Sequence, residues 1–398
     1  MRLLRLRLSD FRNFHRLDLS LRAGASAFVG ANAQGKTNLL EAVYLLATMK
    51  DLRAETEAQV IRREALDDPL PAARVVGEAQ TAEGGLKLEV AIVAREARGR
   101  QPAPQTSGAV ATKTVKVNGV SKRLSSAVGR LTAVLFTAAD IDLITGSPSG
   151  RRRYLDITLS QVDREYVTAR SRFERLITQR NHLLKRLRER GGDTDQLAFW
   201  DDRLAGDGGF LFAARATALS ELAGLAAEAH ASLAPGERLE LAYQPRIEGV
   251  GLEDLADGAA AAAAYAEALR SGVPRDVAAG MTLQGPHRDD LAFTLDGLAA
   301  SGFASRAQQR TIALALRLAE ARLLDARRGE PPLLLLDDIL SEMDAARARS
   351  VIEAVSSYDQ LLVTATEVER FPPEFVDGAE LFTVEAGSVI AQSREAVG

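Results

Sequence analysis

The chain has 398 residues, 46% of them apolar and 26% charged, and its formal net charge is −4 at pH 7. This length and apolar content predict a soluble globular protein of two or three domains, and the negative charge argues against a globally basic nucleic-acid binder. The chain has no cysteine, and its four histidines are scattered, which excludes disulfides, thiol nucleophiles and a zinc cluster, so hydrolytic metal chemistry would need oxygen ligands.

The first 120 residues are expected to form strands around one helix. Alternating apolar residues predict strands at 3–8, 16–21, 25–30, 74–79, 86–94 and 114–120, the last with an Asn118-Gly119 turn. Apolar residues at three- and four-residue spacing predict a helix at 36–47. Residues 95–112 are rich in Pro, Gly and small polar residues and are expected to be a mobile loop.

Neither a signal-peptide core nor a membrane span is expected. The N-terminus alternates Arg and Leu like a strand, and no stretch approaches the roughly 20 apolar residues that cross a bilayer. We therefore expect a cytoplasmic protein with no membrane partner.

Residues 30–37 fit the phosphate-loop pattern G-x-x-x-x-G-K-[ST]. An apolar strand enters the loop and a helix leaves it, which is the arrangement that directs backbone N–H groups at phosphates. Lys36 would neutralise charge on the β and γ phosphates, and Thr37 would reach Mg²⁺. The expected cofactors are ATP and Mg²⁺, and the expected nucleotide-binding residues are Gly30, Ala31, Asn32, Ala33, Gln34, Gly35, Lys36 and Thr37.

From Ser147 to about residue 275 the apolar period is helical. One long amphipathic helix is expected to end at Gly191-Gly192, with its apolar stripe made by Tyr166, Phe173, Leu176, Ile177, Leu184 and Leu187.

The start of this helical region is strongly basic. Between Ser147 and Arg190 there are twelve Lys or Arg against five Asp or Glu, a local charge of +7. A solvated helical face is one interpretation. The other is a contact with a polyanion, for which Arg170, Arg180 and Arg186 are the candidates.

Strands are expected again at 281–284, 291–295, 333–336 and 360–366, and the four leucines at 333–336 indicate a strand buried on both faces. Asp337 and Asp338 follow these leucines directly. A phosphate loop needs an acidic strand end to hold Mg²⁺, so Asp337 is the expected metal ligand with Thr37, and Asp338 is the candidate catalytic base. The alternative is that the two aspartates only open a turn.

Ser305 precedes an amphipathic helix that has Ile312, Leu316, Ala319 and Leu323 on one face. Unpaired N–H groups and the positive end of the helix dipole gather at such an opening. Two interpretations stay open on the residues alone: an ordinary capped surface helix, or a site for an anion.

Lys36 and Asp337 lie 301 residues apart, which indicates an insertion between phosphate loop and acidic strand. This layout resembles ABC-type ATPase heads. The resemblance implies an α/β fold in which residues 1–146 and 276–398 form the ATPase lobe and residues 147–275 an inserted helical lobe. It also implies that Ser305 and Gln308 open a signature helix, which contacts the γ-phosphate held by a partner subunit.

Seven stretches resemble the RecF family of bacterial recombinational-repair ATPases, which is related to SMC heads: 8–14, 29–46, 146–156, 179–184, 283–291, 308–320 and 333–344. The resemblance implies a weak DNA-stimulated ATPase that forms a homodimer on ATP. It also implies binding to duplex or gapped DNA, and loading of RecA with RecR and RecO, in recombinational repair and replication.

Several further roles follow from that resemblance alone. It places a D-loop along the dimer interface at Ser341, Glu342, Met343 and Asp344. It places a γ-phosphate sensor at Thr364 or Thr366. Residues 285–290 leave two interpretations beside the resemblance. One is a polar turn before a strand, with His287 hydrogen-bonded within the fold, and the other is that Arg288 and Asp289 bridge the helical lobe to the head.

Two features depart from the family pattern, and two other classes of protein compete with it. Residues 95–112 look like an insertion relative to a compact family member. Ala307 stands where the family's signature has glycine, which permits close backbone approach to a phosphate. The ATPase subunit of an ABC transporter is an alternative, but such subunits normally have Glu and Pro after the metal aspartate and a Leu-Ser-Gly-Gly-Gln signature. A chromosome-organising ATPase would need a longer coiled coil than the inserted helices supply.

Overall fold

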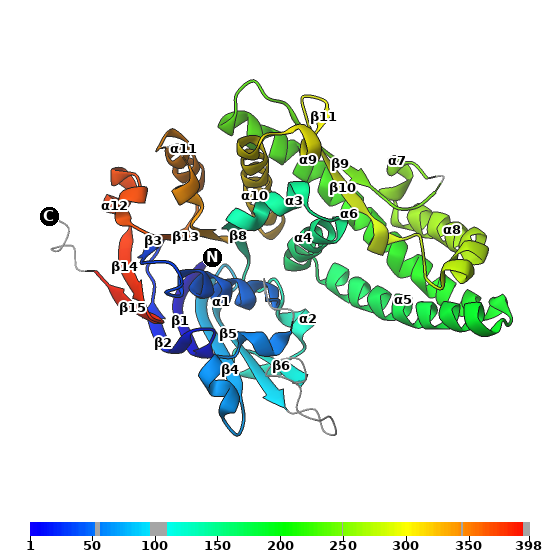
Figure 1. Cartoon of the computed structure of the whole chain (residues 1–398), viewed down its shortest axis with the longest axis horizontal. Helices are drawn as coiled ribbons and strands as arrows, with labels where there is room; N and C mark the ends of the chain where they lie inside the picture. The colour runs from blue at the N-terminus through cyan, green and yellow to red at the C-terminus, as the bar shows by residue number, and fades with distance from the viewer. Residues whose placement is uncertain (52–55, 96–109, 249, 344, 393–398) are drawn as a thin grey trace. The chain divides into compact units, whose positions relative to one another are not determined.

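The computed structural model describes residues 1–51, 56–95, 110–248, 250–343 and 345–392, and the chain forms two units (Figure 1). The sheet unit contains Met1–Ala139 and Glu320–Gly398, and the helical unit contains Asp140–Ala319. The helical unit begins close to the predicted residue 147 but extends beyond the predicted residue 275. Strand β10 (Asp290–Leu295) pairs with β9 (Leu239–Gln244), which keeps this later segment in the helical unit.

One sheet of the sheet unit is antiparallel, in the order β2-β1-β4-β5-β6-β7. Along β1, Leu6 and Leu8 are buried while Arg5 and Arg7 lie on the more open face, because only one face packs on the core. The strands are β1 (Arg2–Phe11), β2 (Phe14–Ser20), β4 (Ala72–Thr81), β5 (Gly84–Arg95), β6 (Val110–Val117) and β7 (Val120–Lys122).

The second sheet has the order β15-β14-β3-β13-β12-β8 and is parallel except for β15. Strands β12 and β13 are buried along their whole length, as expected of parallel strands covered on both faces. Its strands are β3 (Gly24–Val29), β8 (Ala133–Thr137), β12 (Leu333–Asp337), β13 (Gln360–Ala365), β14 (Glu380–Glu385) and β15 (Ser388–Ala391). The helices of this unit include α1 (Lys36–Thr48), α2 (Leu124–Ala127), α11 (Ala345–Val355) and α12 (Pro373–Gly378).

The predicted elements of the first 120 residues are confirmed by β1 to β7 and α1. Asn118 and Gly119, at φ 49° and 81°, form the predicted turn between β6 and β7. Of the predicted loop at 95–112, Arg95 belongs to β5 and residues 110–112 belong to β6. Residues 96–109 lie outside the described residues.

In the helical unit, α5 and α8 pack against the long helix α6. The predicted amphipathic helix is α5, which ends before Gly191 and buries Tyr166, Phe173, Leu184 and Leu187. The helices are α3 (Asp142–Thr145), α4 (Pro148–Val162), α5 (Arg164–Arg190), α6 (Ala198–Leu233), α7 (Leu252–Leu255), α8 (Gly258–Ala279) and α9 (Ala300–Phe303), and β11 (Leu298–Ala299) joins β10. Helix α10 (Arg306–Arg328) begins in the helical unit and ends in the sheet unit, because the boundary falls after Ala319.

The residues Thr194–Leu233 are long and apolar enough to cross a membrane by length and composition. In this fold they form the central helix of the helical unit. Leu204, Leu211 and Phe212 are buried, and the helix packs against α5, α8 and β9. Of its most apolar 18-residue window 39% is buried, and one such helix is weak evidence of a membrane span.

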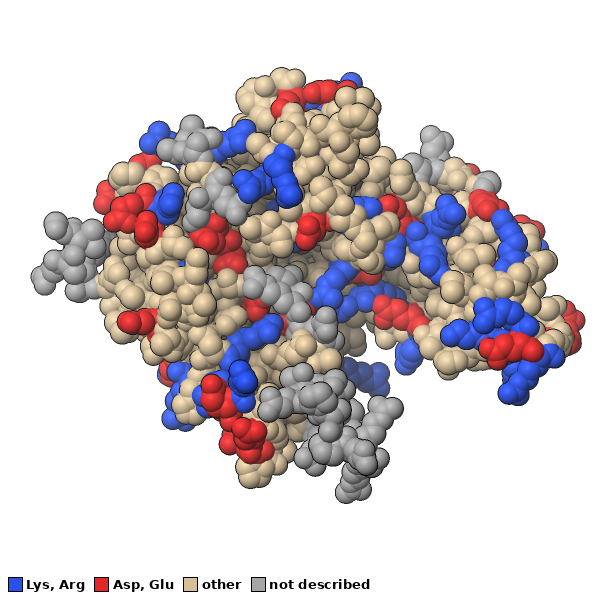
Figure 2. All heavy atoms as spheres, in the orientation of Figure 1, with Lys and Arg blue, Asp and Glu red and all other residues tan. Residues whose placement is uncertain are grey.

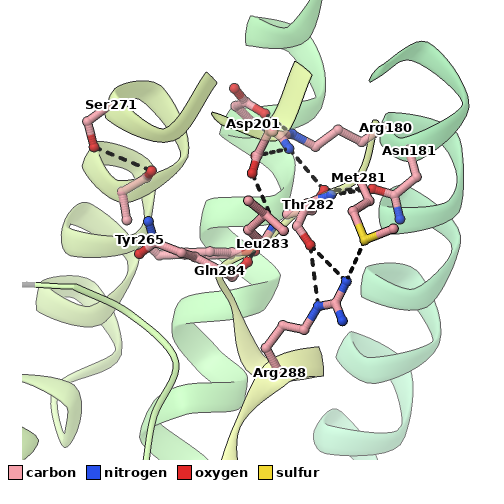
Figure 3. A network of polar contacts seen from close by, with 12 residues as sticks. Arg180, Asn181, Asp201, Tyr265, Ser271, Met281, Thr282, Leu283, Gln284 and Arg288 are labelled. Atoms are coloured by element: carbon pink, nitrogen blue, oxygen red, sulfur yellow. Dashed lines mark hydrogen bonds and ion pairs between the residues drawn. The ribbon is translucent and has the colours of Figure 1, made fainter. Parts of the chain in front are cut away.

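The predicted strand at 281–284 is wrong. This segment is irregular, because side chains bind its backbone N–H groups (Figure 3). Thr282 N donates to Asn181 Oδ1 at 2.8 Å, and Leu283 N donates to Asp276 Oδ1 at 3.0 Å. The strand predicted at 291–295 is confirmed as part of β10.

Candidate nucleotide-binding site

The loop at residues 30–35 connects β3 to α1 as the sequence predicts. Gly35 is the N-cap of α1 at φ 116°, and no side chain caps the helix there. The backbone N–H groups at this helix start are thus left for another partner. A Cβ at Gly30 would lie 2.2 Å from Val384 O, so the loop can approach β14 only with glycine at that position.

Lys36 lies against the loop that it follows. Its side chain is nearly buried, and Nζ donates to Gly30 O at 2.6 Å and to Ala31 O at 2.9 Å. Burial lowers the pKa of the ammonium below its usual value, while the carboxylates of Asp338 and Asp337 oppose this shift. The ammonium group therefore lies near the carboxylates of Asp337 and Asp338 and against the backbone of the phosphate loop.

Thr37 and the acidic strand end meet across the sheet. Thr37 Oγ1 lies 2.8 Å from both carboxylate oxygens of Asp337, and Thr364 Oγ1 lies 2.9 Å from Asp337 Oδ1. β12 and β13 are parallel with Asp337 opposite Thr364, which brings the two side chains together. Thr364 also accepts a hydrogen bond from Asp338 N at 2.9 Å. Thr364 thus contacts the acidic pair, whereas Thr366 follows the end of β13.

Lys36, Thr37 and Asp337 line a cavity of about 220 Å³. Asp338 turns the chain at the end of β12 with φ 53° and lines the cavity beside Asp337. The hydroxyl of Thr37 and the carboxylate of Asp337 are hard oxygen donors, which suit Mg²⁺. The residues that line the cavity are Asn32, Ala33, Gly35, Lys36, Thr37, Asn38, Asp337 and Asp338.

Two supports of the loop were missed in the sequence. Asn13, in the turn between β1 and β2, donates to Gln34 O at 2.8 Å and accepts from Asn38 Nδ2 at 2.8 Å. Ala386 N, in the turn between β14 and β15, donates to Gln34 Oε1 at 2.6 Å. These turns reach the loop only in the folded chain, so no local sequence pattern predicts the contacts.

The helix opening predicted from Ser305 is a capping box. Ser305 N donates to Gln308 Oε1 at 2.8 Å, and Gln308 N donates to Ser305 Oγ at 3.2 Å. Ala307 is exposed beside them. The opening lies in the helical unit and the phosphate loop in the sheet unit.

The predicted D-loop is described only in part. Ile339–Glu342 forms a short 3₁₀ turn after β12, and Met343 follows it. Asp344 lies outside the described residues, as do the side chains of Ser341 and Glu342.

The prediction that Arg180 contacts a polyanion is wrong, because its side chain is 0% exposed. Nε donates to Asp201 Oδ1 at 2.6 Å, and Nη1 donates to Asp276 Oδ2 at 2.6 Å and to Thr282 Oγ1 at 2.9 Å (Figure 3). A fully buried cation needs such partners, and this one joins α5, α6 and α8. Sequence spacing alone cannot separate it from the solvent-facing arginines of the same helix.

The other two candidate arginines differ in exposure. Arg170 is 18% exposed and pairs with Asp156 and Glu174. Arg186 is exposed and donates to Gln196 Oε1 at 2.7 Å. On the open face of α5, Arg186 lies in line with Arg164 and Arg175, since these three exposed residues recur every eleven positions, about three helical turns. Figure 2 shows Lys and Arg gathered, with some acidic residues, over the part of the molecule that carries α5 and α8.

The segment around Asp289 is tied into the helical unit. Asp289 accepts from Arg215 Nη1 at 2.9 Å, from Arg246 N at 2.8 Å and from the Tyr243 hydroxyl. His287 is hydrogen-bonded within the fold as expected, with Nε2 3.1 Å from Thr282 O. The bridge to the head expected from Arg288 and Asp289 stays a prediction.

Comparisons with known proteins agree with this geometry. The family model described as the RecF/RecN/SMC N terminal domain matches residues 2–376. The DNA replication and repair protein RecF of Roseiflexus castenholzii is 41% identical, with 96% of this chain and 98% of that protein covered. The RecF protein of Chloroflexus aurantiacus is 40% identical, with the same two coverages.

Solved structures show the same similarity. A structure described as the recombination mediator protein RecF-ATP in the RecFOR pathway has a TM-score of 0.84, is 27% identical, and covers 98% of both chains. The Smc head domain of Pyrococcus yayanosii has a TM-score of 0.53 and 14% identity over 98% of this chain and 97% of that one. The second likeness shows a shared SMC-type, ABC ATPase head fold, which is the α/β class predicted from the sequence.

Proposed function

The chain belongs to the RecF family of the RecF/RecN/SMC proteins, and on that premise we propose that it is an ATP-dependent DNA-binding protein of recombinational repair and replication. The observation that carries the proposal is the cluster of Thr37, Asp337 and Thr364 beside the buried Lys36. Family membership disfavours the transporter alternative.

ATP would bind with its phosphates in the loop of residues 30–37. Lys36 Nζ would leave the carbonyls of Gly30 and Ala31 and bind phosphate oxygens instead. The ammonium group already lies at the loop, so it would have to move only a short way. Thr37 and Asp337 would hold Mg²⁺, which supplies positive charge against the β and γ phosphates. Asp338 would accept the proton of the attacking water at a carboxylate oxygen, so ATP would be hydrolysed to ADP and phosphate. As in the family that the chain resembles, we expect this ATPase activity to be weak and stimulated by DNA.

Dimerisation would complete each site. The opening at Ser305 presents helix N–H groups, and such groups suit the γ-phosphate held by a second copy of the chain. ATP would therefore join two subunits as a homodimer, and hydrolysis would release them. The exposed arginines of α5 would meet the phosphates of duplex or gapped DNA.

The pathway partners follow from the relatives. The RecF-ATP structure is described as belonging to the RecFOR pathway, and we extend this to RecR, RecO and the loading of RecA here. The proposed role implies that the protein works on DNA in the cytoplasm.

The experiment is fluorescence anisotropy of a labelled gapped duplex with ATP, with ADP and without nucleotide. The proposal expects affinity at least about tenfold higher with ATP than with ADP, and no ATP effect in Lys36→Ala. Equal affinity in all three conditions would contradict it.

A further inference from the structure

The opening at Ser305 continues into the helical unit as a chain of polar contacts. Gln308 Nε2 donates to Glu237 Oε1 at 2.9 Å, and Glu237 Oε2 lies 3.1 Å from His230 Nε2. His230 is 0% exposed near the end of α6, and Glu237 is 27% exposed in the turn before β9. The side chains of His230, Glu237 and Gln308 thus connect helix α6 to the start of α10.

Both ends of the Gln308 amide are occupied within its own subunit. Oε1 accepts from Ser305 N at 2.8 Å while Nε2 donates to Glu237. An ionised carboxylate only accepts and a backbone N–H only donates, so these two partners together permit one orientation of the amide. Without Glu237, only the bond from Ser305 N would hold the amide, and its Nε2 would have lost its acceptor.

The fixed Gln308 amide also determines which hydrogen-bond donors the helix opening at Ser305 presents. Ser305 Oγ accepts from Gln308 N at 3.2 Å, so its hydroxyl proton is left to donate elsewhere. Helix geometry gives the N–H groups of Arg306 and Ala307 no intrahelical acceptor. The opening therefore presents donors, which is the pattern that an anion requires.

We propose that Glu237 is a positioning residue for the signature opening. Held by His230, it fixes the Gln308 amide, and the capping box then holds Ser305 in the orientation that donates to the γ-phosphate of a partner subunit. In this arrangement Gln308 acts inside its own subunit and not on the nucleotide. The inference rests on the proposed ATP-dependent dimer.

The test compares three variants by sedimentation with ATP. Glu237→Ala removes the acceptor, and Glu237→Gln keeps an oxygen for Gln308. Glu240→Ala is the matched control, because Glu240 is exposed on β9 and bonds Thr294 and Arg238. Glu237→Ala should weaken the dimer about tenfold, since one opening occurs on each subunit of a two-fold dimer. Glu237→Gln and Glu240→Ala should stay within about twofold of the parent.

Two readouts separate positioning from a loss of stability. The affinity of the monomer for ATP depends on the phosphate loop, so it should be the same in Glu237→Ala and the parent. In a Gln308→Ala background, adding Glu237→Ala should change dimerisation by less than about twofold, because Glu237 acts through Gln308.

A Glu237→Ala protein that dimerises with ATP as tightly as the parent would overturn the inference, and so would full additivity of the two alanine substitutions. If the parent itself stays monomeric with ATP, the proposed function fails instead. Hydrogen exchange of the Gln308 backbone N–H, which the capping box protects, then decides the inference in the monomer. This N–H should exchange about ten times faster in Glu237→Ala than in Glu240→Ala. Equal exchange rates would overturn it.

Discussion

Lys36 and Asp338 line one cavity but would act at different stages. Lys36→Ala removes the cation that faces the β and γ phosphates, so it should remove most ATP affinity, by about 100-fold or more. Asp338→Asn keeps the shape and the charge partners of the phosphates, so it should bind ATP like the parent while hydrolysis falls about 100-fold or more.

Titration with a fluorescent ATP analogue and a phosphate-release assay measure the two effects. Glu83→Gln, a change in a turn between β4 and β5, serves as the control for an acidic residue outside the cavity. An Asp338→Asn protein that loses ATP binding as badly as Lys36→Ala would contradict the division of roles.

Arg180 is predicted to support the helical unit and not to contact DNA. Arg180→Met leaves Asp201 and Asp276 without their shared cation, which should cost about 3 to 5 kcal/mol. Trp200, the one tryptophan of the chain, lies on α6 and reports urea unfolding of this unit by fluorescence. Arg175→Met, on the exposed face of the same helix, should change the midpoint little, and a comparable shift in both variants would refute the assignment.

His287 should make the stability of the helical unit depend on pH. Burial lowers the pKa of its imidazole from 6.5 to about 4, so between these values the unfolded chain binds a proton that the folded chain does not. The stability is therefore complete above about pH 6.5 and falls as the pH drops toward 4, by up to about 3 kcal/mol. His287→Gln should flatten the urea midpoint across this window. His182→Gln, a change at an exposed position of α5, is the control, and an unchanged slope in His287→Gln would show that another group titrates.

At the level of elements, substitutions at the start of α10 test whether this helix opening contacts the nucleotide of a partner subunit. If the Ala307 methyl group holds the backbone away from a phosphate, Ala307→Gly should strengthen ATP-dependent dimerisation or speed hydrolysis, despite the roughly 1 kcal/mol that glycine costs in a helix. Ser305→Arg should weaken dimerisation. Both effects should be present with ATP and absent with ADP in sedimentation. A Ser305→Arg protein that dimerises like the parent would make the opening an ordinary capped helix end.

The elements with a strong local period could be predicted from the sequence. β1 to β7, α1, α5 and β12 follow from alternation, amphipathic spacing or a run of leucines, and the phosphate loop follows from its glycines between a strand and a helix. The segment at 281–284 could not, because Asn181 and Asp276 bind its N–H groups from other elements. The buried role of Arg180 and the contacts of Asn13 and Ala386 with the loop could not be predicted for the same reason, because their partners are distant in the sequence.

At the level of the whole molecule, the exposed face of α5 should govern DNA affinity. Replacing Arg164, Arg175 and Arg186 together by Glu should abolish ATP-dependent binding to a gapped duplex and leave ATP affinity unchanged. A partial loss should come with a salt slope smaller by about 2 to 3, since each phosphate contact contributes about 0.9.

A matched charge change locates the effect. Arg238, Arg270 and Arg275 are exposed elsewhere on the helical unit, and replacing them by Glu changes the net charge equally. If both triple variants weaken DNA binding alike, the effect is one of net charge, and the face of α5 is not the DNA site.

The most direct test of the account is sedimentation of Asp338→Asn, beside the parent chain, with ATP and with ADP. The sites formed by residues 30–37 and by Ser305 lie in different units, and the account has ATP join them between two copies of the chain. It predicts a dimer of the Asp338→Asn protein with ATP, a weaker and transient dimer of the parent, and monomers of both with ADP. A monomer of Asp338→Asn in saturating ATP and Mg²⁺ would contradict the account.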